Sequence, residues 1–432
     1  MAGMGRRALG RRACSGPART LSALYVALLA ASVAPRGAQS EEFLRYVNLS
    51  AEERRTALAP DPTAHGRFGG AAGFADVAKF EAPPPGLTVH VYDLPNEFEK
   101  DVLRKHKECR SYQWAAEVKI PEAFRTLPKA ARAEDADFYL VPFPVKCYNN
   151  YVARQNHSKV NDAYVRLIKW VRSSFTYFDR SGGADHIFIF PSGAGPMLFN
   201  DYAKYVNQSI FLLAEGDRTK TTTNAFKDII VPGYSKLPNS PWREPSERTL
   251  LASFRGNMVH NINLSGNGTK VKVPSQLRTA LEQEMRAKED VVFSSAKLPD
   301  KKKYAKEILD SKFLLCPRGI TPWTRRVFDG LYGGAVPVLV SDHVELPFEA
   351  FIDWAAFSVK VSEEYAMRPG EFYAKLAELA KSKTYERKLR ALYEARGLLS
   401  WAKDGGVING VLWELERRKR RFKHGSARTW ER

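Results

Sequence analysis

Apolar residues between positions 87 and 361 gather in ten short runs, which are continuous rather than alternating. Continuous runs rich in Val, Ile, Leu and Phe are typical of strands covered on both faces. The pattern therefore predicts ten buried strands. They are Leu87–Tyr92, Phe138–Phe143, His186–Phe190, Ile210–Leu213, Asp228–Val231, Leu250–Phe254, Asp290–Phe293, Lys312–Cys316, Val336–Val340 and Phe357–Val361.

Helical patterns separate many of these runs. In Ser158–Tyr177, the residues Val160, Tyr164, Leu167 and Val171 fall on one stripe of a helix. Shorter helical patterns occupy Ser275–Ala287 and Lys302–Leu309. Strands that alternate with helices predict an α/β fold with parallel sheets. Ten strands are many for one such sheet, so we expect two adjacent α/β units.

The division between the two units is expected near Pro232–Ser246, which holds four Pro and one Gly. This predicts an N-terminal Rossmann-like domain over 87–240 and a second one over 241–395. Residues 41–86 are rich in Ala, Gly and Pro, which indicates a stalk or linker. A long helical pattern runs from Pro369 to about Lys423, and residues 396–432 are expected to form a basic helical tail.

The first 40 residues have the pattern of a targeting segment. Five arginines precede an uncharged apolar stretch, Leu21–Ala34, of about 14 residues. This is shorter than the roughly 20 residues that cross a bilayer. Two alternatives remain open: a cleaved signal peptide, or a short type II signal-anchor that crosses the membrane once. A mitochondrial or plastid presequence is the alternative, because it is also rich in Arg and poor in acids.

Five glycosylation sequons favour the secretory route. Their acceptor residues are Asn48, Asn156, Asn207, Asn263 and Asn267. Cysteine usage leaves two possibilities open on that route. A Cys109–Cys147 disulfide can form, or Cys109, Cys147 and Cys316 all stay buried free thiols.

The net charge of +19 is concentrated at the two ends of the chain. Residues 1–40 carry six Arg and no acid, and residues 414–432 carry eight Lys or Arg against three Glu. The excess that remains in the middle suits polyanions or phosphorylated small molecules. It does not by itself indicate nucleic acid.

The segment Ser311–Ser341 carries the most informative chemistry. A predicted strand ends in a turn, and a helix follows with Pro322 near its start and Thr324 as a cap or early-turn residue. A helix start beyond a strand's carboxyl end offers free N–H groups to an anion. Arg325 and Arg326 lie in the first turn, where the helix dipole does not favour cations, so they suit phosphate better.

Asp329 follows on a neighbouring face, where a carboxylate can accept two sugar hydroxyls. The simpler alternative is that Arg325 and Arg326 are solvated surface charges and Asp329 is an ordinary helix residue.

Seven motifs in order resemble the exostosin-like glycosyltransferases (glycosyltransferase family 47), and together they span roughly residues 88–365. The four C-terminal ones read Ser311–Gly319, Thr324–Gly330, Gly334–Leu339, and Leu346–Glu349 together with Ile352-Asp353-Trp354. The upstream ones read Val91–Pro95, Ala136–Pro142 and Phe254-Arg255-Gly256.

The resemblance implies a GT-B architecture, with two facing Rossmann-like domains, and inversion at the sugar's anomeric carbon. It implies a nucleotide-sugar donor in the C-terminal domain, a glycan or polysaccharide acceptor, and a place in the Golgi lumen or membrane. By position, Arg255, Gly319, Thr324, Arg326 and Asp329 would bind the donor. Arg255 and Arg326 would neutralise the diphosphate, and Asp329 would hold the ribose.

The chain departs from the family at two places. Many relatives carry an acid–His pair with Gly just after the third strand of the first domain, where this chain reads Phe190–Gly195 without an acid. Its own pair, Asp185-His186, opens that strand instead. The usual Cys of the family's Gly-Cys-Ile-Pro is Ala335, which looks neutral.

No metal is expected. Asp135-Ala-Asp137 has the spelling of a metal-binding motif but precedes its strand, whereas sites in open α/β sheets lie beyond the carboxyl ends. Arginines can supply the metal's electrostatic role instead. The general base for an inverting transfer is expected among Asp93, Glu215 and Asp217, because each follows a first-domain strand.

Two rival functions remain. The run Arg417–Lys423 is typical of a polyanion- or nucleic-acid-binding protein, although on the secretory route it would be a solvated helix end. An inactive lectin-like relative would bind glycans without transferring sugar. Intact Arg326 and Asp329 argue against the lectin.

Overall fold

A computed structural model describes residues 83–219, 222–263, 270–296, 298, 300–402 and 406–419. The predicted targeting segment and most of the predicted stalk lie outside these residues. So do Asn48 and Asn267. None of the helices within the described ranges is long and apolar enough to cross a membrane.

The first sheet has five parallel strands in the order β1-β2-β3-β4-β6. The strands are β1 (Val89–Val91), β2 (Phe138–Leu140), β3 (His186–Phe190), β4 (Ile210–Leu213) and β6 (Ile229–Ile230). The helices of this half are α5 (Lys100–Lys105), α6 (Ala116–Phe124), α7 (Val145–Cys147), α8 (His157–Ser174), α9 (Tyr177–Ser181) and α10 (Tyr202–Tyr205). All residues of β2, β3 and β4 are buried, as their continuous apolar runs predict.

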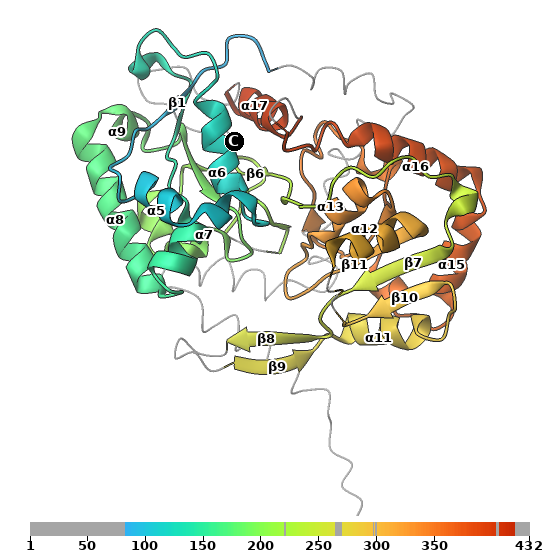
Figure 1. Ribbon diagram of the computed structural model, residues 1–432. Helices are drawn as coiled ribbons and strands as arrows, with labels where there is room; N and C mark the ends of the chain where they lie inside the picture. The colour runs from blue at the N-terminus through green and yellow to red at the C-terminus, as the bar shows by residue number, and fades with distance from the viewer. Residues whose placement is uncertain are drawn as a thin grey trace, which may run out of the picture. The chain divides into compact units, whose positions relative to one another are not determined.

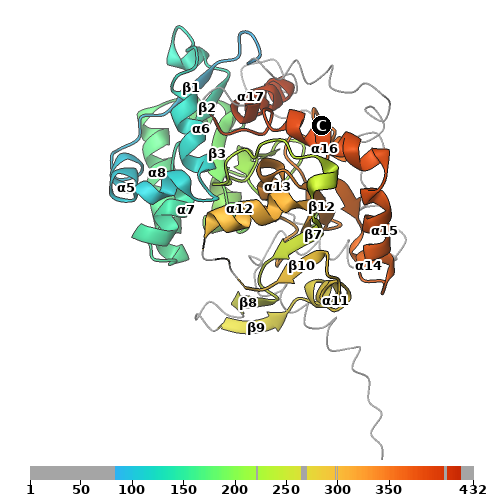
Figure 2. The same ribbon diagram turned by 45° about the vertical axis from the view of Figure 1, so that its right-hand side comes forward.

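The second sheet also has five parallel strands, in the order β10-β7-β11-β12-β14. The strands are β7 (Leu250–Arg255), β10 (Val291–Ser294), β11 (Ser311–Pro317), β12 (Val336–Val340) and β14 (Val359–Val361). In Figures 1 and 2, α12 (Lys301–Asp310) and α13 (Arg326–Gly333) lie on one side of this sheet, and α15 (Glu371–Ala380) and α16 (Lys383–Ala395) lie on the other. The remaining helices are α11 (Gln276–Met285), α14 (Glu363–Ala366) and α17 (Gly406–Lys419).

Each of the ten apolar runs contains a strand of one of these sheets, so the predicted α/β class with two Rossmann-like units is confirmed. The exact domain limits 87–240 and 241–395 stay predictions. Two small additional sheets complete the fold: β8 (Val259–Asn263) pairs with β9 (Lys270–Pro274), and β5 (Gly216–Asp217) pairs with β13 (Val344–Glu345). The β5–β13 pair is antiparallel and joins the chain of the first half to that of the second.

The predicted helical tail is present, and its described part consists of the three helices α15, α16 and α17. Ser382 caps the start of α16, because its side chain accepts a hydrogen bond from the Tyr385 backbone N–H. The start of α13 differs from the prediction, since the helix begins at Arg326 rather than near Pro322.

The basic run in α17 is partly structural, which corrects its interpretation as a solvated helix end. Arg418 is buried, pairs with Glu414, and donates hydrogen bonds to the backbone carbonyls of Lys227 and Asp228 in the first half. Figure 1 shows α17 near β6 accordingly. Lys419 Nζ lies 2.9 Å from Asp137 Oδ1. These partners remove two of the basic residues on which a nucleic-acid site would depend.

The acid–His pair of the first half lies inside the core. His186 Nδ1 is 2.8 Å from Asp185, and its Nε2 is 2.7 Å from the Tyr92 hydroxyl. All three residues are fully buried, and burial lowers the pKa of His186. The pair therefore stabilises the sheet and does not face its carboxyl edge.

The structure also decides between the two cysteine alternatives. Cys109 and Cys147 form a disulfide, which ties the segment after α5 to α7, and Cys316 is a buried free thiol.

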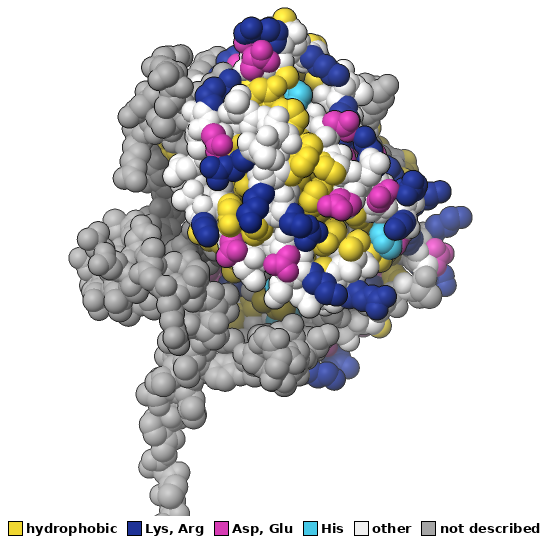
Figure 3. Space-filling view, turned by 90° about the vertical axis from the view of Figure 1, so that its left-hand side faces the viewer, with side chains coloured by type: hydrophobic (Ala, Val, Ile, Leu, Met, Phe, Trp, Pro, Cys, Tyr) yellow, Lys and Arg dark blue, Asp and Glu magenta, His cyan; other side chains and the backbone are white. Residues whose placement is uncertain are grey.

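Charge on the outer face of the first half is mixed. Figure 3 shows its Lys and Arg side chains interspersed with Asp, Glu and apolar groups. The net positive charge of the chain is thus not collected into a basic patch on this face.

Candidate active site

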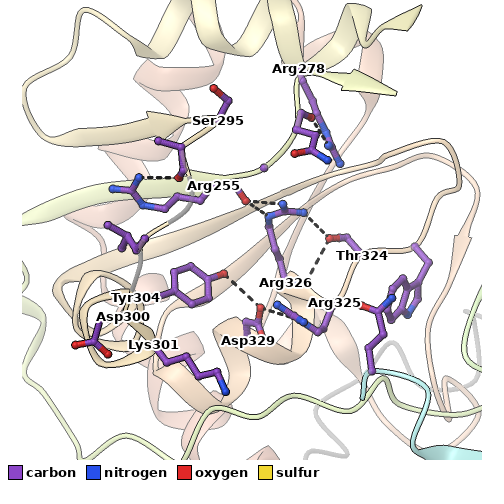
Figure 4. Close-up of a pocket in the computed structure, with 16 residues that line it drawn as sticks. Arg255, Arg278, Ser295, Asp300, Lys301, Tyr304, Thr324, Arg325, Arg326 and Asp329 are labelled. Carbon is purple, nitrogen blue, oxygen red and sulfur yellow. Dashed lines mark hydrogen bonds and ion pairs between the residues drawn. The ribbon is translucent and has the colours of Figure 1, made fainter. Parts of the chain in front are cut away.

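A pocket of about 570 Å³ opens at the carboxyl edge of the second sheet (Figure 4). Parallel strands bring their carboxyl ends to one edge, where α/β proteins build their sites. The wall comes from the ends of β7 and β10, from α11, and from the first turns of α12 and α13. The lining residues used below are Gln113, Arg255, Gly256, Arg278, Tyr304, Trp323, Thr324, Arg325, Arg326 and Asp329.

Arg326, the first residue of α13, points its guanidinium toward the end of β7 (Figure 4). Its Nε and Nη2 donate to the Arg255 carbonyl, and its Nη1 donates to the Thr324 hydroxyl at 3.0 Å. It forms no ion pair with any residue that the structure describes, and burial lowers its pKa. A desolvated cation that borders a pocket and holds only neutral partners is a site for an anion.

Arg278 of α11 is a second cation of the same kind, and sequence reasoning missed it. It donates to the carbonyls of Arg318, Asn257 and Pro317, and within the described ranges it too has no carboxylate partner. It is only 6% exposed. Burial lowers its pKa, and the nearby charge of Arg326 lowers it further.

The ring of Phe254 contacts both arginines. The guanidinium of Arg326 is 4.7 Å from the ring centroid and that of Arg278 is 5.4 Å from it. Cation–π contacts of this type hold the two like charges in place despite their repulsion. The arrangement therefore presents two positive charges side by side to one pocket.

Two other buried arginines show that carbonyl partners alone do not define a ligand site. Arg248 donates to four backbone carbonyls, and Arg396 donates to the carbonyls of Leu331 and Ser240. Neither lines the pocket. The pocket wall is what distinguishes Arg278 and Arg326 from these structural arginines.

Arg255 lies in the pocket wall, but its charge is already paired. Its Nε and Nη2 donate to the carboxylate of Glu307 in α12, and its Nη1 donates to the Ala296 carbonyl. Its backbone carbonyl is the acceptor for Arg326. In this arrangement Arg255 positions Arg326, while Arg278 occupies the second cationic place in the wall.

Asp329 is buried under the pocket and held by three donors. Its Oδ1 accepts from the Ser235 hydroxyl at 2.6 Å, and its Oδ2 accepts from the Tyr304 hydroxyl and from Arg325 Nε, each at 3.3 Å. Ser235 belongs to the segment that leaves the first sheet after β6. The carboxylate thus joins that segment to the first turn of α13.

The two glycines near the arginines leave the space that the guanidinium groups fill. A Cβ on Gly256 would overlap Arg326 Nη2, and a Cβ on Gly319 would come within 3.3 Å of Arg278 Nη2. Thr324 is buried and accepts from Arg326. Gly319 and Thr324 therefore support the arginines, and Gly256 joins them as a residue that the motif contained but sequence reasoning did not single out.

The three candidate bases lie in different surroundings. Asp93 is 81% exposed and pairs with Lys100 at 2.7 Å, a contact that lowers its pKa. Asp217 is buried in β5 and accepts from the backbone and side chain of Thr219. Both are thereby engaged in local structure.

Glu215 lies at the carboxyl edge of the first sheet, immediately before β5. Its carboxylate packs directly against Gly193, where a Cβ would collide with it. Burial lowers the pKa of Lys146, and the charges of Glu117 and, to a smaller extent, Glu215 oppose that lowering. Lys146 in turn lies 5.1 Å from the ring centroid of Trp114, the neighbour of the pocket residue Gln113.

Asp135 and Asp137 are each engaged with side chains of other residues. Asp135 accepts from Arg132, and Asp137 accepts from Thr88 and pairs with Lys419. Across the described part of the chain, no three His, Cys, Asp or Glu side chains gather as metal ligands would.

Among the sequons within the described ranges, Asn156 and Asn207 are exposed. Asn156 also caps α8, because its Oδ1 accepts from the Lys159 backbone N–H. Asn263 ends β8, and its side chain is not described.

Comparison with known protein families agrees with this geometry. The exostosin GT47 domain matches residues 83–376, which contain both five-stranded sheets. The chain belongs to the exostosin GT47 family. It is accordingly a glycosyltransferase, with the α/β architecture that the sequence predicted.

Plant proteins of the exostosin GT47 type are among its relatives. A probable glucuronosyltransferase of Oryza sativa subsp. japonica is 29% identical over 298 residues, which cover 65% of this chain and 68% of that protein. The probable glucuronoxylan glucuronosyltransferase IRX7 of Arabidopsis thaliana is 29% identical, with 67% of each chain covered. The probable beta-1,4-xylosyltransferase IRX10L of Arabidopsis thaliana is 27% identical and covers 69% of this chain and 72% of its own.

Among solved structures, Arabidopsis thaliana UGT89C1 complexed with UDP matches 70% of this chain and 77% of its own, at 13% identity. Its TM-score of 0.30 is too low to relate its site to that of the GT47 chain.

Proposed function

We propose that this GT47 chain is an inverting glycosyltransferase of the secretory pathway, which transfers a sugar from a nucleotide-sugar donor to a glycan or polysaccharide acceptor. The observation that carries the donor assignment is the pair Arg278 and Arg326, two desolvated cations in one pocket wall, neither of which has a carboxylate partner among the described residues. A diphosphate supplies the negative charge that would balance these two cations, and guanidinium groups bind phosphate oxygens in a planar fork.

Each part of the donor is assigned to residues of the pocket wall. The diphosphate lies against Arg278 and Arg326, while Asp329, at the base of the pocket, accepts hydrogen bonds from the ribose hydroxyls. Thr324, Gly319 and Arg255 hold the two cations in place, Arg255 through its carbonyl and its pair with Glu307. In this proposal Arg255 therefore acts mainly by positioning Arg326.

In the transfer step, the acceptor hydroxyl oxygen attacks the anomeric carbon from the side opposite the diphosphate. The bond between that carbon and the phosphate oxygen breaks, and the leaving diphosphate takes the electron pair. Arg278 and Arg326 stabilise the negative charge that develops there. The acceptor proton passes to a carboxylate, for which we propose Glu215.

Three observations favour Glu215 over the other two carboxylates. It follows the carboxyl end of β4, it precedes the strand that pairs with β13 of the donor half, and its charge acts on Lys146, which lies over the ring of Trp114 beside the pocket residue Gln113. Asp93 is solvated and its pKa is lowered, which weakens it as a base. Asp217 holds Thr219.

A polysaccharide acceptor is supported by the names of the relatives, two of which refer to glucuronoxylan or to xylosyl transfer. A Golgi location of type II topology is supported by the arginine-rich apolar segment at positions 6–34 and by the sequons. The Cys109–Cys147 disulfide supports an oxidising compartment.

Donor hydrolysis across a panel of nucleotide sugars tests the proposal. The full chain should hydrolyse at least one donor slowly without acceptor, and it should do so in chelator, because arginines rather than a metal neutralise the diphosphate. No hydrolysis or nucleotide binding with any donor would favour a lectin-like relative. A requirement for a divalent metal would overturn the electrostatic assignment.

A further inference from the structure

Aromatic and basic side chains form a second cluster outside the donor pocket, around the disulfide of the first half. We call it the aromatic platform. It consists of His106, Tyr112, Trp114, Tyr151 and Tyr234, with Lys119, Lys146 and Lys236. All five aromatic residues are half-buried, so each leaves part of a ring at the surface.

The rings are ordered with respect to one another. Tyr112 and Tyr151 are nearly parallel, with an interplanar angle of 8° and centroids 6.5 Å apart, and the Tyr151 hydroxyl donates to that of Tyr112 at 2.9 Å. His106 stacks on Tyr151 at 4.6 Å. Trp114 meets Tyr112 edge to face at 5.8 Å. Flat, half-exposed rings bind the apolar faces of ligands at little entropic cost, because few rotatable bonds are fixed.

Each of the three lysines lies over one ring of the platform. Lys236 is 5.4 Å from the Tyr112 ring, Lys119 is 4.9 Å from Tyr234, and Lys146 is 5.1 Å from Trp114. None of the three has an ion-pair partner among the residues that the structure describes. Acids act at two places: Glu108 Oε1 is 3.7 Å from His106 Nδ1, and the charges of Glu117 and Glu215 oppose the lowering of the pKa of Lys146 by burial. Lys119 and Lys236 therefore give the platform its positive charge beside the aromatic rings.

The disulfide fixes the two segments that carry the platform. Cys109 lies between His106 and Tyr112, and Cys147 follows Lys146. Besides this bond, packing and the hydrogen bond between Tyr151 and Tyr112 connect the segment after α5 with the segment of α7. The disulfide thus helps to preserve the relative position of the Tyr112 and Tyr151 rings.

Two connections join the platform to the donor pocket. Gln113, between Tyr112 and Trp114, lines the pocket. Its carbonyl accepts from the Tyr234 backbone N–H, and the next residue, Ser235, donates to Asp329. A ligand on the platform would therefore lie next to a donor held by the arginines.

We propose that the aromatic platform binds the acceptor, and that this acceptor is an anionic glycan chain bearing carboxylate or sulfate groups. Sugar rings stack on the tyrosines and Trp114, while the lysines pair with the acidic groups. The inference rests on the proposed donor site, since it makes the platform the place from which the acceptor hydroxyl reaches the sugar.

Binding of matched oligosaccharides to the full chain tests the charge of the ligand. Glucuronoxylan fragments are compared with neutral xylan fragments, and sulfated dextran with neutral dextran, each at two salt concentrations. Both anionic members should bind more tightly than their neutral partners, and the difference should shrink at high salt. A preference for only one of them identifies the acidic group. Equal binding of charged and neutral chains overturns the proposal.

Matched variants test the location. Tyr112→Ala should raise the acceptor KM roughly 5- to 30-fold, as loss of a central aromatic contact does, and Lys236→Ala roughly 2- to 5-fold. Tyr112→Phe keeps the ring and should bind nearly as wild type. The controls are Tyr365→Ala and Lys375→Ala, because Lys375 lies 5.9 Å over the Tyr365 ring in a Lys–Tyr pair outside the platform. They should leave the acceptor KM unchanged.

The donor reaction separates this inference from the proposed function. Tyr112→Ala and Lys236→Ala should hydrolyse the donor at the wild-type rate, since neither residue lines the pocket. Wild-type acceptor KM in both variants, with donor hydrolysis intact, refutes the platform and leaves the donor site standing. If the wild-type protein itself hydrolyses no donor, the proposed function is refuted instead.

Discussion

Replacing Arg326 by methionine distinguishes a ligand-binding arginine from a structural one. Charge-assisted hydrogen bonds contribute about 1.5–3 kcal/mol, so loss of the guanidinium should weaken donor binding roughly 10- to 150-fold. Arg326→Lys should restore binding only in part, because an ammonium lacks the planar fork.

The cost to stability should be small. The substitution removes the donors to the Arg255 carbonyl and the Thr324 hydroxyl, and a carbonyl left without a partner costs about 1–3 kcal/mol. It also removes a cation whose pKa is lowered by burial, and this offsets part of that cost. We expect a free energy of unfolding within about 2 kcal/mol of wild type.

Arg248→Met is the matched control. Arg248 is buried and donates to four backbone carbonyls but does not line the pocket. Its loss should cost more than about 3 kcal/mol of stability and leave donor affinity unchanged in the folded protein. Titration calorimetry with the donor and denaturant unfolding measure the two quantities. An Arg326→Met protein that binds donor like wild type but is strongly destabilised would refute the reasoning.

Three further predictions follow from other parts of the structure. Glu215→Gln should lower kcat at least 100-fold without changing donor affinity, because the amide cannot take up the proton of the acceptor hydroxyl. Steady-state rates measured over a range of pH test this, with Asp93→Asn as the control variant. An unchanged kcat would exclude Glu215 as the base. Cys109→Ser should lower the free energy of unfolding by about 3–4 kcal/mol, since the disulfide closes a loop with a sequence separation of 38, and a stability equal to wild type in denaturant would contradict this. Burial, with a smaller effect of Glu349, raises the pKa of Glu345 to about 7 from an ordinary value near 4.5. The folded state therefore holds this proton more tightly, and its stability should fall as pH rises from about 5 to about 7. In denaturant titrations at several pH values, Glu345→Gln should reduce this pH-dependent loss of unfolding free energy, by at most about 3 kcal/mol. If the variant loses stability with pH as the wild type does, the carboxylate of Glu345 is not buried beside β5.

The parts of the fold that depend on local pattern could be predicted from the sequence. Every continuous apolar run overlaps a parallel strand, and β2, β3, β4 and β12 are buried at every position, because such runs need cover on both faces. The breaks within the helical tail were harder to predict, because the apolar spacing continues through the segments between α15, α16 and α17. The capping residue Ser382 was the available signal for one of these breaks.

In the site, too, residues close in sequence could be predicted and residues brought together by packing could not. Thr324, Arg326 and Asp329 lie within one short segment, so a strand–turn–helix pattern was enough to bring them together. Arg278 was missed because it lies on a different helix and reaches the pocket through the carbonyls of Pro317 and Arg318. The pairing of Arg255 with Glu307 was not readable either, because the two residues are separated by 52 positions and meet only through the packing of α12 on the sheet.

Donor hydrolysis followed by proton NMR tests the central claim most directly, because it reports both the donor and the stereochemistry. We expect the full chain to hydrolyse at least one nucleotide sugar in chelator, with the first-formed free sugar in the anomeric configuration opposite to that of the donor. Arg326→Ala should need a much higher donor concentration for the same rate. A retained anomeric configuration would contradict the inverting mechanism, and wild-type donor dependence in Arg326→Ala would contradict the assigned site.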